Sequence, residues 1–225
     1  MGRNLYIKNI LPWWIGIYVQ GRLFMVNPYT VVDLFEKTIA KYAGSKYGVA
    51  VESCCAALFL CCKYLKVKTV YLPKFTYPGV ACSVIHAGGK CKFDNRYWYG
   101  QYSLKPYPIW DAALRFSRGM YVKGSYYCLS FHVKKHIPIG RGGMILCDSK
   151  KAYEWFKRAR FDGRNEVSLS EQKDITVCGY NMYLTPEQAV RGLQLFDSIK
   201  DKTINNLNCY EQGYPDLSKI KAYKS

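Results

Sequence analysis

Short apolar segments alternate with amphipathic helical segments along most of the chain, and this alternation restricts its fold more than any other feature. The segments expected to be strands are residues 47–51, 69–72, 90–93, 109–113, 126–131 and 144–147. Those expected to be helices are residues 31–42, 54–64, 78–86, 150–160 and 185–199. Such alternation is typical of an α/β fold, in which a mainly parallel sheet carries helices on both faces.

The chain has 225 residues, enough for one domain or two small ones. We expect an irregular N-terminal segment over residues 1–30, an α/β domain over residues 31–200 and a polar tail over residues 201–225. Within the domain, residues 95–106 are expected to be a polar and aromatic connector. No apolar run has the length of a membrane span, and the first residues lack a signal-peptide pattern. We therefore expect a cytoplasmic protein without a membrane partner.

The chain is strongly basic, with 33 Lys and Arg against 16 Asp and Glu and a formal net charge of +17. Such an excess attracts polyanions, and the 21 tyrosines offer surfaces on which bases stack. Contact with nucleic acid is one interpretation, and a solvated basic surface is the other. The sequence has no zinc finger, RNA-binding signature or long basic helix that would favour the first.

The ten cysteines do not form a metal-binding pattern. Four of them lie in the run CCAALFLCC at residues 54–62, without a C-x-x-C pair or a histidine at ligand spacing. The run is typical of a buried helix, in which cysteine packs as a small hydrophobic residue. We expect reduced structural cysteines and no metal.

Two polar segments follow expected strands in the first half of the chain, where open α/β sheets bind ligands. In residues 52–58, Ser53 begins a helix whose free N–H groups suit a phosphate, although the serine could serve only as a helix cap. In residues 75–78, Tyr77 either stacks on a planar ligand or packs against protein. Each segment alone leaves both interpretations open.

Two further segments carry an acid and a lysine. In residues 110–113, Asp111 ends an apolar strand, and a buried carboxylate needs a partner such as a pyridinium nitrogen unless it lies at the surface. Residues 130–136, SFHVKKH, are followed by the Gly pair of GRGG. A lysine at a strand end with a hydroxyl five residues earlier suits a Schiff-base lysine beside a phosphate, whereas a basic loop is the simpler alternative.

In this order, the four segments resemble those of the DegT/DnrJ/StrS aminotransferases, fold-type I pyridoxal-phosphate (PLP) enzymes that mostly aminate nucleotide-linked keto-sugars. The S-F-H-x-x-K segment with its Gly pair resembles the lysine motif of that family, and the serine with two cysteines resembles its Ser-Gly-Thr phosphate loop. Residues 179–195 are similar to its G-x-N…Q-A…G-L-x-Q-L segment. The resemblance covers about residues 31–199.

The resemblance implies a reduced PLP-binding large domain, with residues 201–225 as a remnant of the small domain. It places the Schiff base on Lys135 rather than Lys134 and gives Asp111 the pyridine nitrogen. It also implies a homodimer in which Asn181 reaches the phosphate of the neighbouring subunit. The cofactor-binding residues that it implies are Ser53, Cys54, Cys55, Tyr77, Asp111, Ser130, His132, Lys135 and Asn181.

Three functions follow as alternatives. The first is amino transfer from a small-molecule donor to a keto-sugar or a similar small carbonyl compound through the Lys135 Schiff base. The second is PLP chemistry on a modified base in nucleic acid, as in viral or phage DNA modification. Arg115 and Arg141 would then contact the polyanion, together with the helix that carries Lys157, Arg158 and Arg160. The third is a non-catalytic binding protein of the same fold.

Overall fold

The computed structural model describes residues 27–200 and 213–223 in full, together with the backbone of residues 17–19 and 22–24. The strands are β1 (Ile17–Val19), β2 (Arg22–Phe24), β3 (Tyr47–Val51), β4 (Thr69–Pro73), β5 (Lys90–Asp94), β6 (Tyr102–Ser103), β7 (Ile109–Asp111), β8 (Tyr126–Ser130) and β9 (Gly143–Cys147). The helices are α1 (Thr30–Ala43), α2 (Cys54–Tyr64), α3 (Pro78–His86), α4 (Lys150–Ala159) and α5 (Pro186–Ile199), with 3₁₀ turns η1 (Leu169–Glu171), η2 (Leu217–Lys219) and η3 (Lys221–Tyr223).

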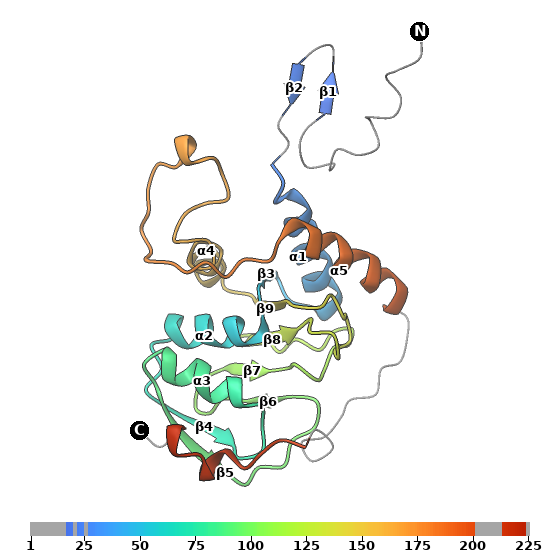
Figure 1. The fold of residues 1–225 in the computed structure, drawn as a ribbon. Helices are drawn as coiled ribbons and strands as arrows, with labels where there is room; N and C mark the ends of the chain where they lie inside the picture. The colour runs from blue at the N-terminus through green and yellow to red at the C-terminus, as the bar shows by residue number, and fades with distance from the viewer. Residues whose placement is uncertain (1–16, 20–21, 25–26, 201–212, 224–225) are drawn as a thin grey trace.

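The central sheet has five strands in the order β3-β9-β8-β7-β6 (Figure 1). Only the β7–β8 pair in it is parallel, whereas β3–β9, β8–β9 and β6–β7 are antiparallel. The prediction of a mainly parallel sheet is therefore wrong, and the sheet is mixed. Parallel neighbours need a long crossover, usually a helix. A helix provides one between the parallel strands β4 and β5, but no helix lies between β8 and β9.

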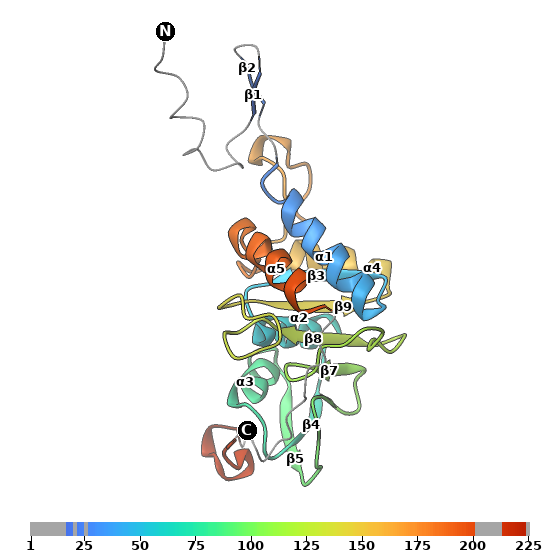
Figure 2. The ribbon, with the colours of Figure 1, turned by 90° about the vertical axis from the view of Figure 1, so that its right-hand side faces the viewer.

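Helices cover both faces of the sheet, as predicted, because strand side chains alternate between the faces. Val49, Cys128 and Ile145 pack on the side of α2, α3 and α4. Ala50 and Leu129 point the opposite way and pack with residues of α1 and α5. These two helices lie side by side (Figures 1 and 2). Full burial of one Val, Leu or Ile side chain contributes about 1.5–3 kcal/mol, so each face adds substantially to stability.

Local sequence explains where these helices begin and end. The Ser53 hydroxyl accepts a hydrogen bond from Ala56 N and caps α2. Pro78 occupies the first turn of α3, where a missing N–H costs nothing. Gly44 ends α1 with a φ of 87°, a left-handed conformation that favours glycine.

Short elements lie in segments for which the sequence predicted none. Strands β1 and β2 pair antiparallel within the N-terminal segment that was expected to be irregular. Strand β6 interrupts the expected connector and pairs with β7. Among the described residues, no helix has the length and apolar character needed to cross a membrane.

Residues 213–223 return to the edge of the molecule that carries β4 and β5. Leu217 N donates to Lys74 O at 2.8 Å, and Asp216 forms a bridge with Phe75. The Lys74 ammonium lies 4.0 Å from the Asp216 carboxylate. This part of the predicted tail is therefore docked on the α/β domain, whereas residues 201–212 lie outside the described residues.

A group of charged side chains, here called the Arg160 cluster, joins α1, α4 and the segment after α4. It consists of Asp33, Glu36, Lys157, Arg160 and Glu166. Arg160 is fully buried, donates to Glu36 and the backbone of β3, and reaches Glu166 at 2.6 Å. Lys157 lies 2.9 Å from Asp33, 3.2 Å from Glu36 and 2.9 Å from Glu166. Charges on distant segments thus hold one another around a buried pair, Arg160 and Glu36.

Candidate functional site

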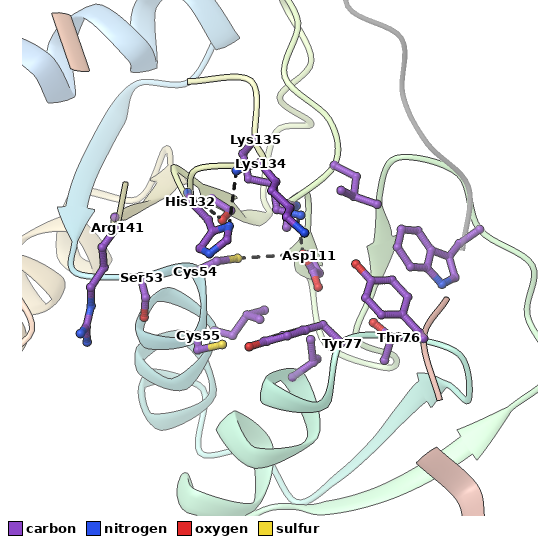
Figure 3. Close-up of a pocket in the computed structure, with 18 residues that line it drawn as sticks. Ser53, Cys54, Cys55, Thr76, Tyr77, Asp111, His132, Lys134, Lys135 and Arg141 are labelled. Carbon is purple, nitrogen blue, oxygen red and sulfur yellow. Dashed lines mark hydrogen bonds between the residues drawn. The ribbon is translucent and has the colours of Figure 1, made fainter. Parts of the chain in front are cut away.

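A cavity of about 390 Å³ collects side chains from all four polar segments that the sequence singled out (Figure 3). The predicted residues that line it are Ser53, Cys54, Cys55, Tyr77, Asp111, Ser130, His132, Lys135 and Arg141. They come from the start of α2, the start of α3, the ends of β7 and β8 and the segment between β8 and β9. The fold therefore brings these residues together, while their chemical roles stay predictions.

Asp111 lies at the end of β7 and is only 6% exposed. Its Oδ1 accepts a hydrogen bond from Ala113 N at 3.0 Å and lies 4.0 Å from the Cys54 thiol. Its Oδ2 accepts a hydrogen bond from the Tyr102 hydroxyl at 2.9 Å. Burial raises the pKa of the Asp111 carboxyl, while the Ala113 and Tyr102 hydrogen bonds and the charge of Lys135 act to lower it. The cavity thus contains a buried acid supported by neutral donors.

Lys135 lies on the lysine loop, residues 131–142, which connects β8 to β9. Hydrogen bonds between strand ends close this loop at its base: Phe131 N donates to Gly142 O at 2.9 Å, and Gly140 N donates to Phe131 O at 3.2 Å. Burial lowers the pKa of Lys135, and the charge of Asp111 opposes that shift. Lys134 is exposed but also borders the cavity, so it does not point away from the site.

The N-terminus of α2 forms another wall. Cys54 and Cys55 occupy the first turn, where backbone N–H groups have no acceptor within the helix. A Cβ on Gly143 would lie 2.5 Å from the Ser53 carbonyl carbon, so only glycine lets β9 approach this turn. Burial raises the pKa of the Cys54 thiol and that of Cys55, the latter to about 11, so both stay neutral near pH 7. Ser53 is a helix cap at a turn that also presents free donors to the cavity.

Two predicted residues lie outside the main cavity, and a third borders it but is already paired with a carboxylate. Asn181 is exposed and outside this cavity, with its amide 3.4 Å from Asp162 Oδ2. Arg115 borders a separate small cavity beside Ser130. Arg141 borders the main cavity, but its guanidinium lies 2.7 Å from the Glu52 carboxylate.

At the end of α4, two of the charges expected to contact a polyanion are instead paired with carboxylates of the protein. These are Lys157 and Arg160, which belong to the Arg160 cluster and contact carboxylates directly. The guanidinium of Arg158 donates to the Thr176 hydroxyl at 2.7 Å. Nucleic-acid contact through these residues stays a prediction: the charges of Lys157 and Arg160 are paired with carboxylates, whereas Arg158 contacts a neutral hydroxyl.

Sequence reasoning missed the aromatic side of the cavity. Trp98 and Tyr214 line it, with ring centroids 6.2 Å apart and planes 20° apart. Trp98 Nε1 donates to Phe75 O at 2.9 Å, which fixes the turn before Thr76 and Tyr77. The aromatic residues of the expected connector, which include Trp98, could have indicated this wall of the cavity. Tyr214 could not have been found in this way, because it comes from a segment that is distant in the sequence. Among the described residues, no group of three or more His, Cys, Asp or Glu could hold a metal ion.

The model of the DegT/DnrJ/EryC1/StrS aminotransferase family matches residues 20–95 and 120–224. Residues 96–119, which carry β6, β7 and Asp111, lie between the two matched ranges. The spore coat polysaccharide biosynthesis protein SpsC of Bacillus subtilis (strain 168) is 22% identical, over 76% of this chain and 57% of that protein.

Solved structures show the same fold. AtS13 from Actinomadura melliaura has a TM-score of 0.65 and 17% identity, covering 75% of this chain and 60% of its own. The sugar aminotransferase CalS13 from Micromonospora echinospora has a TM-score of 0.62 and 15% identity, covering 75% and 60%. The chain thus spans about three fifths of the length of these relatives. The prediction of an α/β fold of the fold-type I PLP-dependent transferase kind is confirmed.

Proposed function

Because the chain belongs to the DegT/DnrJ/EryC1/StrS aminotransferase family, we propose that it is a PLP-dependent enzyme that transfers an amino group to a keto-sugar or a similar small carbonyl compound. The observation that carries this proposal is the shared cavity, in which an amine from Lys135, a buried carboxylate from Asp111 and the N-terminus of α2 lie together. The names of SpsC, a polysaccharide biosynthesis protein, and CalS13, a sugar aminotransferase, support a sugar as acceptor.

The donor set of the cavity fits PLP. The cofactor has an aldehyde, a basic ring nitrogen and a phosphate, and the cavity offers a lysine, a buried acid and a helix N-terminus with nearby hydroxyls. When bound, PLP supplies an aldehyde that condenses with amines and a ring that accepts electrons from the substrate. The hydroxyls of Ser53 and Ser130 and the N–H groups of Cys54 and Cys55 would hold the phosphate.

The residues of this chain would supply orientation and proton movement. The Asp111 carboxylate would hold a proton on the ring nitrogen. Burial lowers the pKa of Lys135, which increases its neutral fraction and suits it to accept and return a proton at Nζ. The Tyr77 ring, which is 54% exposed in this chain, would cover one face of the cofactor.

We further propose that the protein acts as a homodimer. Asn181 is exposed and lies outside the cavity of its own chain, which suits a residue that reaches the cavity of a second copy. Light scattering should then report a dimer when PLP is bound. A monomer with PLP fully bound would contradict the homodimer.

The decisive experiment is reduction of the PLP-loaded protein with borohydride, followed by peptide mapping. We expect the modification on Lys135 in wild type. The Lys135→Ala variant should lose covalent attachment and lower amino transfer by about a thousandfold or more. Lys134→Ala is the matched control, because this neighbour borders the same cavity but is exposed. A modified Lys134, or no modification of either residue, would overturn the proposal.

A further inference from the structure

We propose that Tyr102 is a positioning residue that fixes the Asp111 carboxylate through a buried hydrogen-bond relay, Thr76–Tyr102–Asp111. The inference rests on the proposed function, because Asp111 would act on the cofactor ring and Tyr102 would act through Asp111. Residues 96–119 lie outside the family match, so the relay depends on a segment of this chain that the family model does not describe.

The relay is built into the pairing of two strands. Strands β6 and β7 are antiparallel, and their register places Tyr102 directly opposite Asp111. The Tyr102 hydroxyl lies 2.9 Å from Asp111 Oδ2 and 2.6 Å from the Thr76 hydroxyl. Thr76 is 1% exposed and Tyr102 is 4% exposed, so water has little access to replace either group.

Counting protons gives the relay a direction. An ionised carboxylate only accepts hydrogen bonds, and a tyrosine hydroxyl has a single proton to donate. Tyr102 therefore donates to Asp111, and its oxygen accepts the proton of Thr76. Burial raises the pKa of Tyr102 well above its ordinary value, and the charge of Asp111 raises it further, so the phenol keeps its proton. When Asp111 is ionised, all three groups are satisfied together only in this direction.

The remaining contacts of Asp111 leave a distinct task for Tyr102. Ala113 N binds Oδ1, whereas Tyr102 binds Oδ2, so the two donors fix the rotation of the carboxylate. A phenylalanine would fill the same space but would release Oδ2. The titratable groups that face Asp111 from the packed elements are Cys54 and Cys55 of α2, Cys128 of β8, Lys135 of the lysine loop, Tyr102 of β6 and Tyr214 of the C-terminal segment.

The test uses the apoprotein with carbon-13-labelled aspartate, and Asp111→Asn assigns the Asp111 signal. Loss of the hydrogen bond from Tyr102 destabilises the ionised form of Asp111, so Tyr102→Phe should raise the Asp111 pKa by about one unit or more. Thr76→Val keeps the Tyr102 donor and should give a smaller shift in the same direction. Tyr127→Phe is the matched control: Tyr127 is fully buried, but its hydroxyl contacts Gln101, and it should leave the titration unchanged.

A second readout is equilibrium PLP binding, in which Tyr102→Phe should raise the Kd about tenfold and Tyr127→Phe should not. An Asp111 pKa that is unchanged in Tyr102→Phe would overturn the relay. If that variant does not fold, an unchanged pKa in Thr76→Val would do the same. Wild-type protein that fails to attach PLP to Lys135 would overturn the proposed function instead, while the apoprotein titration would still report on the relay.

Discussion

The interior holds two groups of charged side chains, and they differ in how their charges are compensated. In the Arg160 cluster, each positive group contacts at least two carboxylates directly. In the cavity, the direct contacts of Asp111 are an amide, a phenol and a thiol, and Lys135 influences it through its charge.

This difference distinguishes charges that stabilise the fold, in the Arg160 cluster, from the charge of Asp111, which is expected to act in chemistry. Burial lowers the pKa of Arg160, but Glu36 and Glu166 raise it by more, so the guanidinium stays charged. At Asp111 burial prevails and raises the pKa, despite the opposing contacts. A buried acid whose charge is only partly supported is costly for an apoprotein, and it is suited to a cationic ring nitrogen.

The largest effect is expected from removing a charge of the compensated group, the Arg160 cluster. Arg160→Met leaves Glu36 buried without its main partner and should lower the free energy of unfolding by about 3–5 kcal/mol. Covalent PLP attachment should be retained while the protein is folded. Urea denaturation measures the first effect and borohydride trapping the second.

Lys150→Met provides the control, because Lys150 is exposed and pairs with Glu154 one helical turn away. Lys150→Met should lower the free energy of unfolding by about 0.5 kcal/mol or less. If Arg160→Met lowers the free energy of unfolding by as little as the control does, the Arg160 cluster does not hold α1 and α4 together.

The second prediction uses pH to test the partly compensated group. Burial lowers the pKa of Lys135 below the ordinary 10.5 of lysine, and Asp111 pulls it upward. Removing that charge with Asp111→Asn should lower the pKa further, so the midpoint at which Lys135 becomes reactive moves to lower pH. Reductive methylation at pH 7, followed by peptide mapping, should then be a few-fold faster at Lys135. The exposed Lys134 is the internal reference, and a midpoint that moves upward would contradict the assignment.

The smallest effect is expected at the exposed charges. Arg141→Glu breaks the pair with Glu52, but the Arg141 side chain is 67% exposed, so stability should fall by less than about 1 kcal/mol. The double variant Arg115→Glu, Arg141→Glu should bind duplex DNA within about twofold of wild type, because Arg141 is already paired and Arg115 borders a separate cavity. A larger loss with a shallower salt dependence would support the nucleic-acid alternative.

The sequence predicted the elements whose boundaries are set locally. Helices α2 and α3 span the predicted residues, because a serine cap and a first-turn proline set their starts. Strand directions depend on which segments pair, and the lysine loop joins β8 to its antiparallel neighbour without a helix. Strand β6 has two residues and is defined by its pairing with β7 rather than by a pattern of its own.

The same distinction applies to the cavity. Ser53 and Lys135 come after strands and Asp111 ends one, and the order of their segments was enough to predict that they meet. Tyr102 and Tyr214 were missed because their positions depend on strand register and on a distant segment that docks beside β4. No local pattern contains that information.

The closed base of the lysine loop has a consequence for the order of folding. The contacts that shape this loop join residues about ten positions apart, whereas Ser53 and Asp111 must approach it from much farther along the chain. Short loops close at a small entropic cost and form early, while distant contacts form late. We therefore expect the β8–β9 hairpin to form and orient Lys135 before the rest of the chain has folded. The slow step of folding would then be the packing of the segments of Ser53 and Asp111 against this hairpin.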